Sequence, residues 1–132
     1  MGVKRFEDLN VWQEARILVK EIYNISKTGD FSKDFGLTGQ IQRAAVSIMN
    51  NIAEGFDSDS NAEFIRFLTY ARRSASEVQC NLYVALDQKY IKKPEFDSLY
   101  EMSEKTRRMI TALKKYLKSA KLNTQTRKRV NA

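Results

Sequence analysis

Apolar residues recur every three or four positions in four segments of the chain, and this spacing is typical of helices that bury one face. The segments run from about Asp8 to Lys27, from Leu37 to Gly55, from Asn61 to Lys89, and from Pro94 to about Leu122. The third segment steps 4-3-4-3, which is the seam spacing of coiled-coil-like bundles. Short connections favour antiparallel neighbours. The pattern therefore predicts an all-α fold without strands, an antiparallel up-down-up-down four-helix bundle.

The second segment has two apolar flanks where a surface helix needs one. Its main stripe is expected to face the core and consists of Leu37, Ile41, Ala44, Ala45, Ile48 and Ile52. Val46, Met49 and Ala53 form a second flank. A single bundle cannot cover both flanks, so we predict a homo-oligomer with these three residues at the interface. Gly55 stands where a helix C-cap glycine is expected.

The connections carry turn and capping signals. The segment Thr28–Gly36 contains two glycines and two aspartates, which predicts a loop. Phe31 and Phe35 are expected to pin this loop against the bundle. Ser60, followed three residues later by Glu63, matches a capping box at the start of the third helix.

Positive charge is concentrated at one end of the chain. The net charge is +7, but residues 1–104 carry 13 Lys and Arg against 16 Asp and Glu, whereas residues 105–132 carry 10 Lys and Arg and no acidic residue. Such asymmetry is typical of proteins with a polyanionic partner. It is equally typical of a solvated helix face followed by a flexible basic end. Residues 1–122 are expected to form the bundle domain, and residues 123–132, without apolar periodicity, a disordered basic tail.

The residue inventory argues against catalysis. The chain has no histidine, which removes the usual general base and the Ser-His and Cys-His nucleophile pairs. Cys80 is the single cysteine, so neither an intrachain disulfide nor a Cys-based zinc site can form. No glycine-rich phosphate loop is present. We therefore expect no enzyme, no catalytic residues, no metal, no cofactor and no small-molecule substrate.

The sequence shows neither a signal-peptide pattern nor a membrane-spanning pattern. The first residues lead into no apolar run of signal-peptide length. No apolar segment is long enough to span a bilayer. The sequence thus predicts a cytoplasmic protein without a membrane partner.

The second helix also carries a family resemblance. Gln40-Ile41, Arg43–Ile48 and Asn51–Gly55 resemble the signature of the four-helix-bundle proteins encoded within intervening sequences of bacterial 23S ribosomal RNA genes. The resemblance covers about residues 6 to 118. It implies a small all-helical subunit, often a homopentamer, with no established catalytic activity and a suspected role around RNA. A more distant resemblance reaches the accessory proteins of diversity-generating retroelements, which are basic pentameric barrels that work with RNA and a reverse transcriptase.

Two functions remain open. The first is an oligomeric protein, with a pentamer as the first choice, that binds RNA or DNA through phosphate contacts. Base readout is not expected, because Tyr116 is the only aromatic residue in the basic region. The alternative is a protein-protein interaction scaffold with no nucleic-acid role, whose basic tail keeps it soluble. The candidate nucleic-acid-binding residues are Arg43, Lys105, Arg107, Arg108, Lys114, Lys115, Lys118, Lys121, Arg127, Lys128 and Arg129.

Two departures from the family pattern weaken the nucleic-acid hypothesis. Gln42 stands where the family commonly has a second arginine, beside Arg43. Ser58 stands where a basic residue often follows the Glu-Gly turn. Two phosphate contacts that the resemblance would imply are thus missing.

Overall fold

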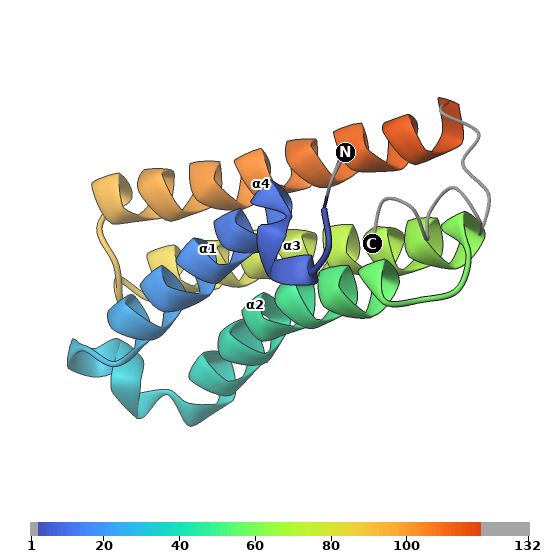
Figure 1. Ribbon diagram of the computed structural model, residues 1–132. Helices are drawn as coiled ribbons and strands as arrows, with labels where there is room; N and C mark the ends of the chain where they lie inside the picture. Colours follow the sequence, from blue (N-terminus) through green and yellow to red (C-terminus); the bar gives the residue numbers. More distant parts are fainter. Residues whose placement is uncertain (1–2, 120–132) are drawn as a thin grey trace.

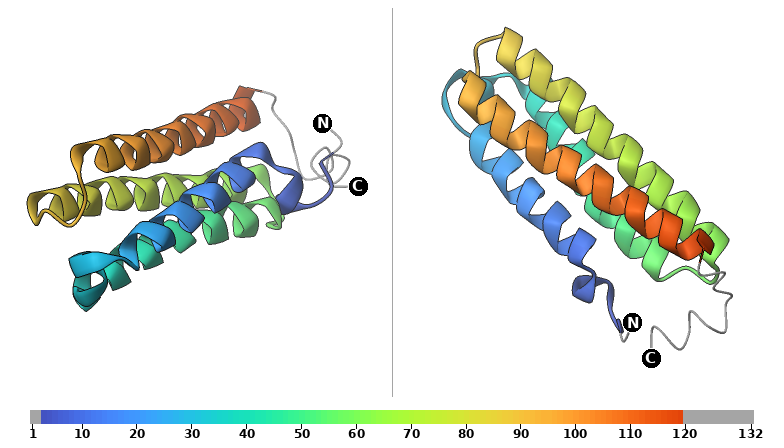
Figure 2. Two further views of the ribbon diagram at one scale, coloured as in Figure 1. Left: turned by 90° about the vertical axis from the view of Figure 1, so that its left-hand side faces the viewer. Right: turned by 90° about the horizontal axis from the view of Figure 1, so that it is seen from above.

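Four long helices form an antiparallel bundle in the computed structural model, which describes residues 3–119 (Figure 1). Each helix runs in the opposite direction to the one before it, as Figure 1 and both views of Figure 2 show. Residues 3–119 contain no strand. The elements are η1 (Phe6–Asp8), α1 (Asn10–Ser26), η2 (Gly29–Lys33), α2 (Phe35–Phe56), α3 (Asn61–Asp87) and α4 (Lys93–Ser119). The expected all-α four-helix bundle is confirmed.

A single apolar core lies between the helices. Each helix packs against its neighbours in the chain, α1 also packs against α4, and the contact between α2 and α3 is the most extensive. The predicted stripe of α2 is buried throughout. So is the seam of α3, which consists of Phe64, Leu68, Ala71, Ala75, Val78, Leu82 and Ala85. The 4-3-4-3 spacing therefore identified the buried face correctly.

Gly55 serves helix packing, and the expectation that it caps α2 is wrong. The helix continues to Phe56, and Asp57 is the C-cap residue. A Cβ atom at Gly55 would lie 2.8 Å from Cδ1 of Phe64 and 2.9 Å from Cβ of Phe67. Only a glycine lets the end of α2 approach the first turns of α3 this closely.

The connection between α1 and α2 also differs from the expected loop. Residues 29–33 form η2, and Phe31 is fully buried, with its ring stacked 5.5 Å from that of Tyr90. Phe35 is 82% exposed, so only one of the two phenylalanines pins the connection. Phe35 is exposed because α2 begins at this residue: the carboxylate of Asp34 caps the helix by accepting a hydrogen bond from the Leu37 amide at 3.0 Å. The same carboxylate accepts from the Tyr90 hydroxyl, which raises the pKa of that tyrosine.

Two further polar positions are explained by local hydrogen bonds. Ser60 caps α3 by accepting from the Glu63 amide at 3.2 Å, as the capping-box pattern predicts. Thr106 interrupts the apolar seam of α4 and is fully buried. Its hydroxyl donates to the backbone carbonyl of Met102 at 2.9 Å, so the core holds no unsatisfied hydroxyl at this residue.

We expect Gly55→Ala to destabilise the bundle by about 1–3 kcal/mol, because the added methyl group overpacks the contact with Phe64 and Phe67. Gly39→Ala, in the same helix, is the matched control. Its Cβ would meet only the flexible end of the Arg43 side chain, so higher helix propensity should stabilise α2 by about 0.5–1 kcal/mol. Urea unfolding followed by circular dichroism measures both changes. A Gly55→Ala variant as stable as the Gly39→Ala variant would contradict this packing account.

Candidate nucleic-acid interface

Basic side chains from α3 and α4 meet along the groove between these two helices, which lie side by side in Figure 2. One depression of about 340 Å³ is lined by Arg72, Arg107 and Lys115, among others. A neighbouring depression of about 270 Å³ is lined by Arg72, Arg73 and Arg107. With the two lysines described next, these residues define what we call the basic groove: Arg72, Arg73, Arg107, Lys114, Lys115 and Lys118.

Lys114 shows how closely the cations of the basic groove are gathered. Its side chain is half-buried on the flank of α4 that faces α3. Burial lowers the pKa of Lys114, and the nearby charges of Arg72, Lys118 and Arg73 lower it further. Positive charges that repel one another in the free protein favour the binding of a polyanion.

Residues 105–132 contain no acidic residue, but carboxylates from outside this run lie close to some of its basic side chains. Three of its members form ion pairs with carboxylates from elsewhere: Lys105 with Glu14 at 3.4 Å, Arg107 with Glu104 at 2.9 Å, and Arg108 with Glu101 at 2.7 Å. Among residues 3–119, the remaining five members of the basic groove form no ion pair. Positive charge that a partner can reach is therefore concentrated on the second half of α4 and on the middle of α3.

Glu104, which also lines the first depression, connects the two helices at one end of the basic groove. It accepts hydrogen bonds from Gln79 of α3 at 2.9 Å and from Arg107 of α4 at 2.9 Å. These bonds, that from Gln79 first, lower the pKa of Glu104. The carboxylate thus stays ionised at neutral pH and holds Arg107 in place at the edge of the groove.

The other predicted site residues lie elsewhere. Arg43 lines a separate depression on the outer side of α2, together with Val46 and Tyr23 of α1. Val46, Met49 and Ala53 are all half-buried in the single chain, and their role at an oligomer interface stays a prediction. The tail residues of the predicted set fall outside the described residues; they are Lys121, Arg127, Lys128 and Arg129.

Arg72 and Arg73 were missed as site residues by the sequence analysis. The seam of α3 shows which face is buried, but it does not show which flank turns toward α4. Arg72 lies two helical turns before Gln79, which contacts Glu104, so both residues occupy the flank beside α4. Only the packed structure shows that this flank of α3 lies beside α4.

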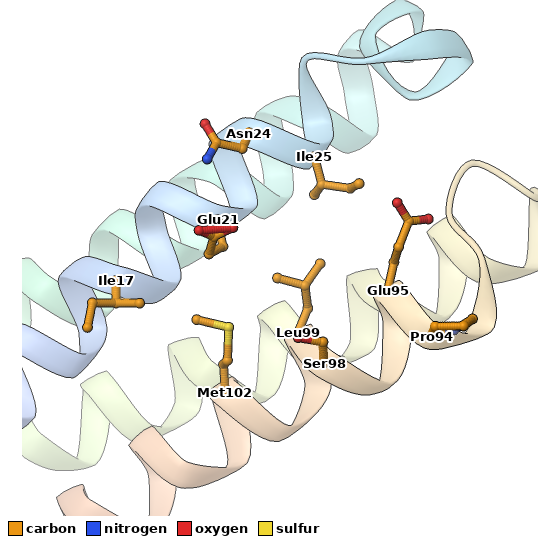
Figure 3. A pocket seen from close by; sticks show the side chains of 9 residues that line it. All are labelled: Ile17, Glu21, Asn24, Ile25, Pro94, Glu95, Ser98, Leu99 and Met102. Carbon is orange, nitrogen blue, oxygen red and sulfur yellow. The ribbon is translucent and has the colours of Figure 1, made fainter.

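A second groove, between α1 and α4, has the opposite character (Figure 3). This apolar groove of about 640 Å³ is lined by Ile17, Ile25 and Met102, among other residues. The charged side chains that line it are the carboxylates of Glu21 and Glu95. These carboxylates would repel phosphates, whereas the basic groove on the other side of α4 would attract them.

Potential metal ligands, the single cysteine and the character of the helices complete the description of residues 3–119. No group of three or more potential metal-ligating side chains comes together in this part of the chain. Cys80 is exposed on α3 and lines none of the depressions described above. The helices of residues 3–119 also include none with the length and apolar character that crossing a membrane requires.

Comparison with known proteins agrees with the fold. Residues 7–112 match the family described as 23S rRNA-intervening sequence protein. A crystal structure of a protein with unknown function from the S23 ribosomal protein family of Bacteroides thetaiotaomicron superimposes with a TM-score of 0.73. It shares 25% sequence identity, and the alignment covers 80% of this chain and 98% of that chain. No match was found among curated proteins. The chain belongs to the 23S rRNA-intervening sequence protein family.

Proposed function

We propose that the protein is a non-catalytic nucleic-acid-binding protein that holds RNA or DNA by phosphate contacts in the basic groove. The observation that carries this proposal is the convergence of arginines from α3 with lysines from α4, which gathers unpaired cations on one surface. The family description refers to ribosomal RNA, and the structural neighbour comes from a ribosomal protein family. Both fit an RNA partner.

The dimensions of the basic groove suit a nucleic-acid backbone. Arg107 and Lys118 are separated by eleven residues of α4, which is about 16 Å along the helix axis. Cations spread over this length can contact several successive phosphates and release the counterions bound to them. Lys121 and the three cations of the basic tail would extend the same electrostatic attraction. No acceptor or donor array for base edges is required for this mode of binding.

The salt dependence of binding tests the groove. We expect the double variant Arg72→Gln/Lys115→Gln to lose two phosphate contacts, so that the slope of log affinity against log salt for duplex DNA becomes shallower by up to about 1.8. Deleting residues 121–132 should reduce the slope by up to about 3–4. The charge-matched control is Lys20→Gln/Lys27→Gln, two exposed lysines of the α1 region. Fluorescence anisotropy with one labelled RNA and one labelled duplex provides the measurement.

Two outcomes would contradict the proposal. If the control double variant lowers affinity as much as the groove variant, binding reflects net charge and not this surface. If the full-length protein binds neither probe even near 50 mM salt, the alternative of a protein-protein interaction scaffold takes its place. The apolar groove between α1 and α4 would then be the surface to examine.

We further propose that the protein is a homo-oligomer, with a pentamer as the first choice because the family resemblance implies it. Val46→Glu should dissociate the oligomer while leaving helicity intact, because a buried unpaired charge at an interface is costly. Asn10→Glu, at the exposed first residue of α1, is the control. Light scattering coupled to gel filtration should give five times the 15.3 kDa subunit mass for the wild type. A monomeric wild type at micromolar concentration would refute oligomerisation.

A further inference from the structure

Two arginine–aromatic pairs lie on α3 beside the basic groove. The guanidinium carbon of Arg66 is 5.5 Å from the centroid of the Phe67 ring, and that of Arg73 is 5.9 Å from the centroid of the Tyr70 ring. The rings of Phe67 and Tyr70 meet edge to face, with their centroids 6.1 Å apart. The four side chains form a continuous run of contacts, which we call the stacking row: Arg66, Phe67, Tyr70 and Arg73.

The stacking row is accessible to solvent and is held in place by packing against α2. Arg66 and Arg73 are exposed, and Tyr70 is 40% exposed. Phe67 is half-buried where α3 meets Gly55, so one of the two rings of the row is anchored in the close contact between α2 and α3. In the part of the chain that the structure describes, neither arginine is engaged by a carboxylate. An arginine held against an aromatic ring keeps the outer face of its planar guanidinium open for a further stacked group.

The stacking row and the basic groove are continuous through Arg73, which belongs to both. A strand whose phosphates lie in the groove can therefore turn its bases toward Tyr70 and Arg73. Aromatic rings and arginine planes stack on nucleobases of every kind. In a duplex, however, the faces of the bases are already stacked on one another, so a duplex can use only the phosphate contacts.

We infer that this combined surface binds single-stranded RNA or DNA in preference to duplex, with unpaired bases stacked on Tyr70 and Arg73. The inference rests on the proposed function and adds the class of nucleic acid. It also replaces the expectation that base contacts are absent, since that expectation considered only the aromatic residues near the basic C-terminal region. Stacking tolerates any sequence, so the preference concerns strandedness and not base identity.

Substitution of the stacking side chains tests the inference. Tyr70→Leu should weaken the binding of single strands by about 5- to 150-fold, the range for loss of one stacked base, without changing the salt slope or the affinity for duplex. Arg73→Lys keeps the charge but removes the planar group, so it should also weaken single-strand binding selectively. The matched control is Tyr83→Leu, a 51% exposed tyrosine farther along α3 whose ring packs against Phe96.

The probes are labelled oligouridylate, oligothymidylate and a duplex, each of about 12 nucleotides or base pairs. Circular dichroism confirms that each variant is folded. Equal affinity of the wild type for single strands and duplex, or equal effects of Tyr70→Leu and Tyr83→Leu, would overturn the inference while leaving phosphate binding intact. Absence of binding to every probe would instead refute the proposed function. Comparison of the two single strands shows whether RNA or DNA is preferred.

Discussion

The close approach of α2 and α3 is the contact on which the rest of the structure depends. Gly55 leaves no side chain between the end of α2 and the rings of Phe64 and Phe67. Farther along, the hydroxyl of Ser74 in α3 donates to that of Ser47 in α2 at 2.9 Å. These contacts set the rotation of α3 about its own axis. The helical period fixes the directions of all its side chains relative to one another, so fixing one face fixes the others. One orientation of α3 therefore places Arg72 toward α4 and Tyr70 away from it.

The charge distribution follows from that orientation and from the antiparallel arrangement of α4. Around the middle of α4, Lys105 pairs with Glu14 of α1, and Arg107 and Arg108 pair with Glu104 and Glu101 of α4 itself. The second half lies beside Arg72 and Arg73, where burial, and after it the nearby like charges, lower the pKa of Lys114. The part of α4 after Glu104, which is uniformly basic in sequence, thus has a neutralised portion and a portion whose charge is free to bind. Glu104, held by Gln79 and Arg107, marks the boundary between them.

The sequence predicted the elements of this fold better than the relations between them. Apolar periodicity identified all four helices and the buried stripes of α2 and α3, because burial leaves a direct record every three or four residues. Gly55 was misinterpreted because a glycine at a helix end suits both a C-cap and a close contact. Phe35 was misplaced because a phenylalanine in a turn gives no sign of its direction, and here Asp34 caps α2 and leaves the ring exposed.

The sequence predicted the part of the candidate site that lies on α4 but not the part that lies on α3. Lysines and arginines of α4 were visible as an acid-free run, and three of the lysines remain unpaired in the basic groove. The contribution of α3 could not be found, because a seam shows which residues are buried and not which neighbour lies beside each flank. Arg72 and Arg73 gain a role only from their positions next to α4, and Tyr70 gains one only from its contact with Arg73.

Lysine footprinting tests the basic groove most directly. The full-length protein is acetylated with and without a saturating single-stranded oligonucleotide, and mass spectrometry compares the modification of each lysine. The account predicts strong protection of Lys114, Lys115 and Lys118, with Lys20, Lys27 and Lys89 reacting equally in both samples. Protection confined to Lys121 and to Lys128 of the basic tail, or spread equally over all lysines, would contradict it.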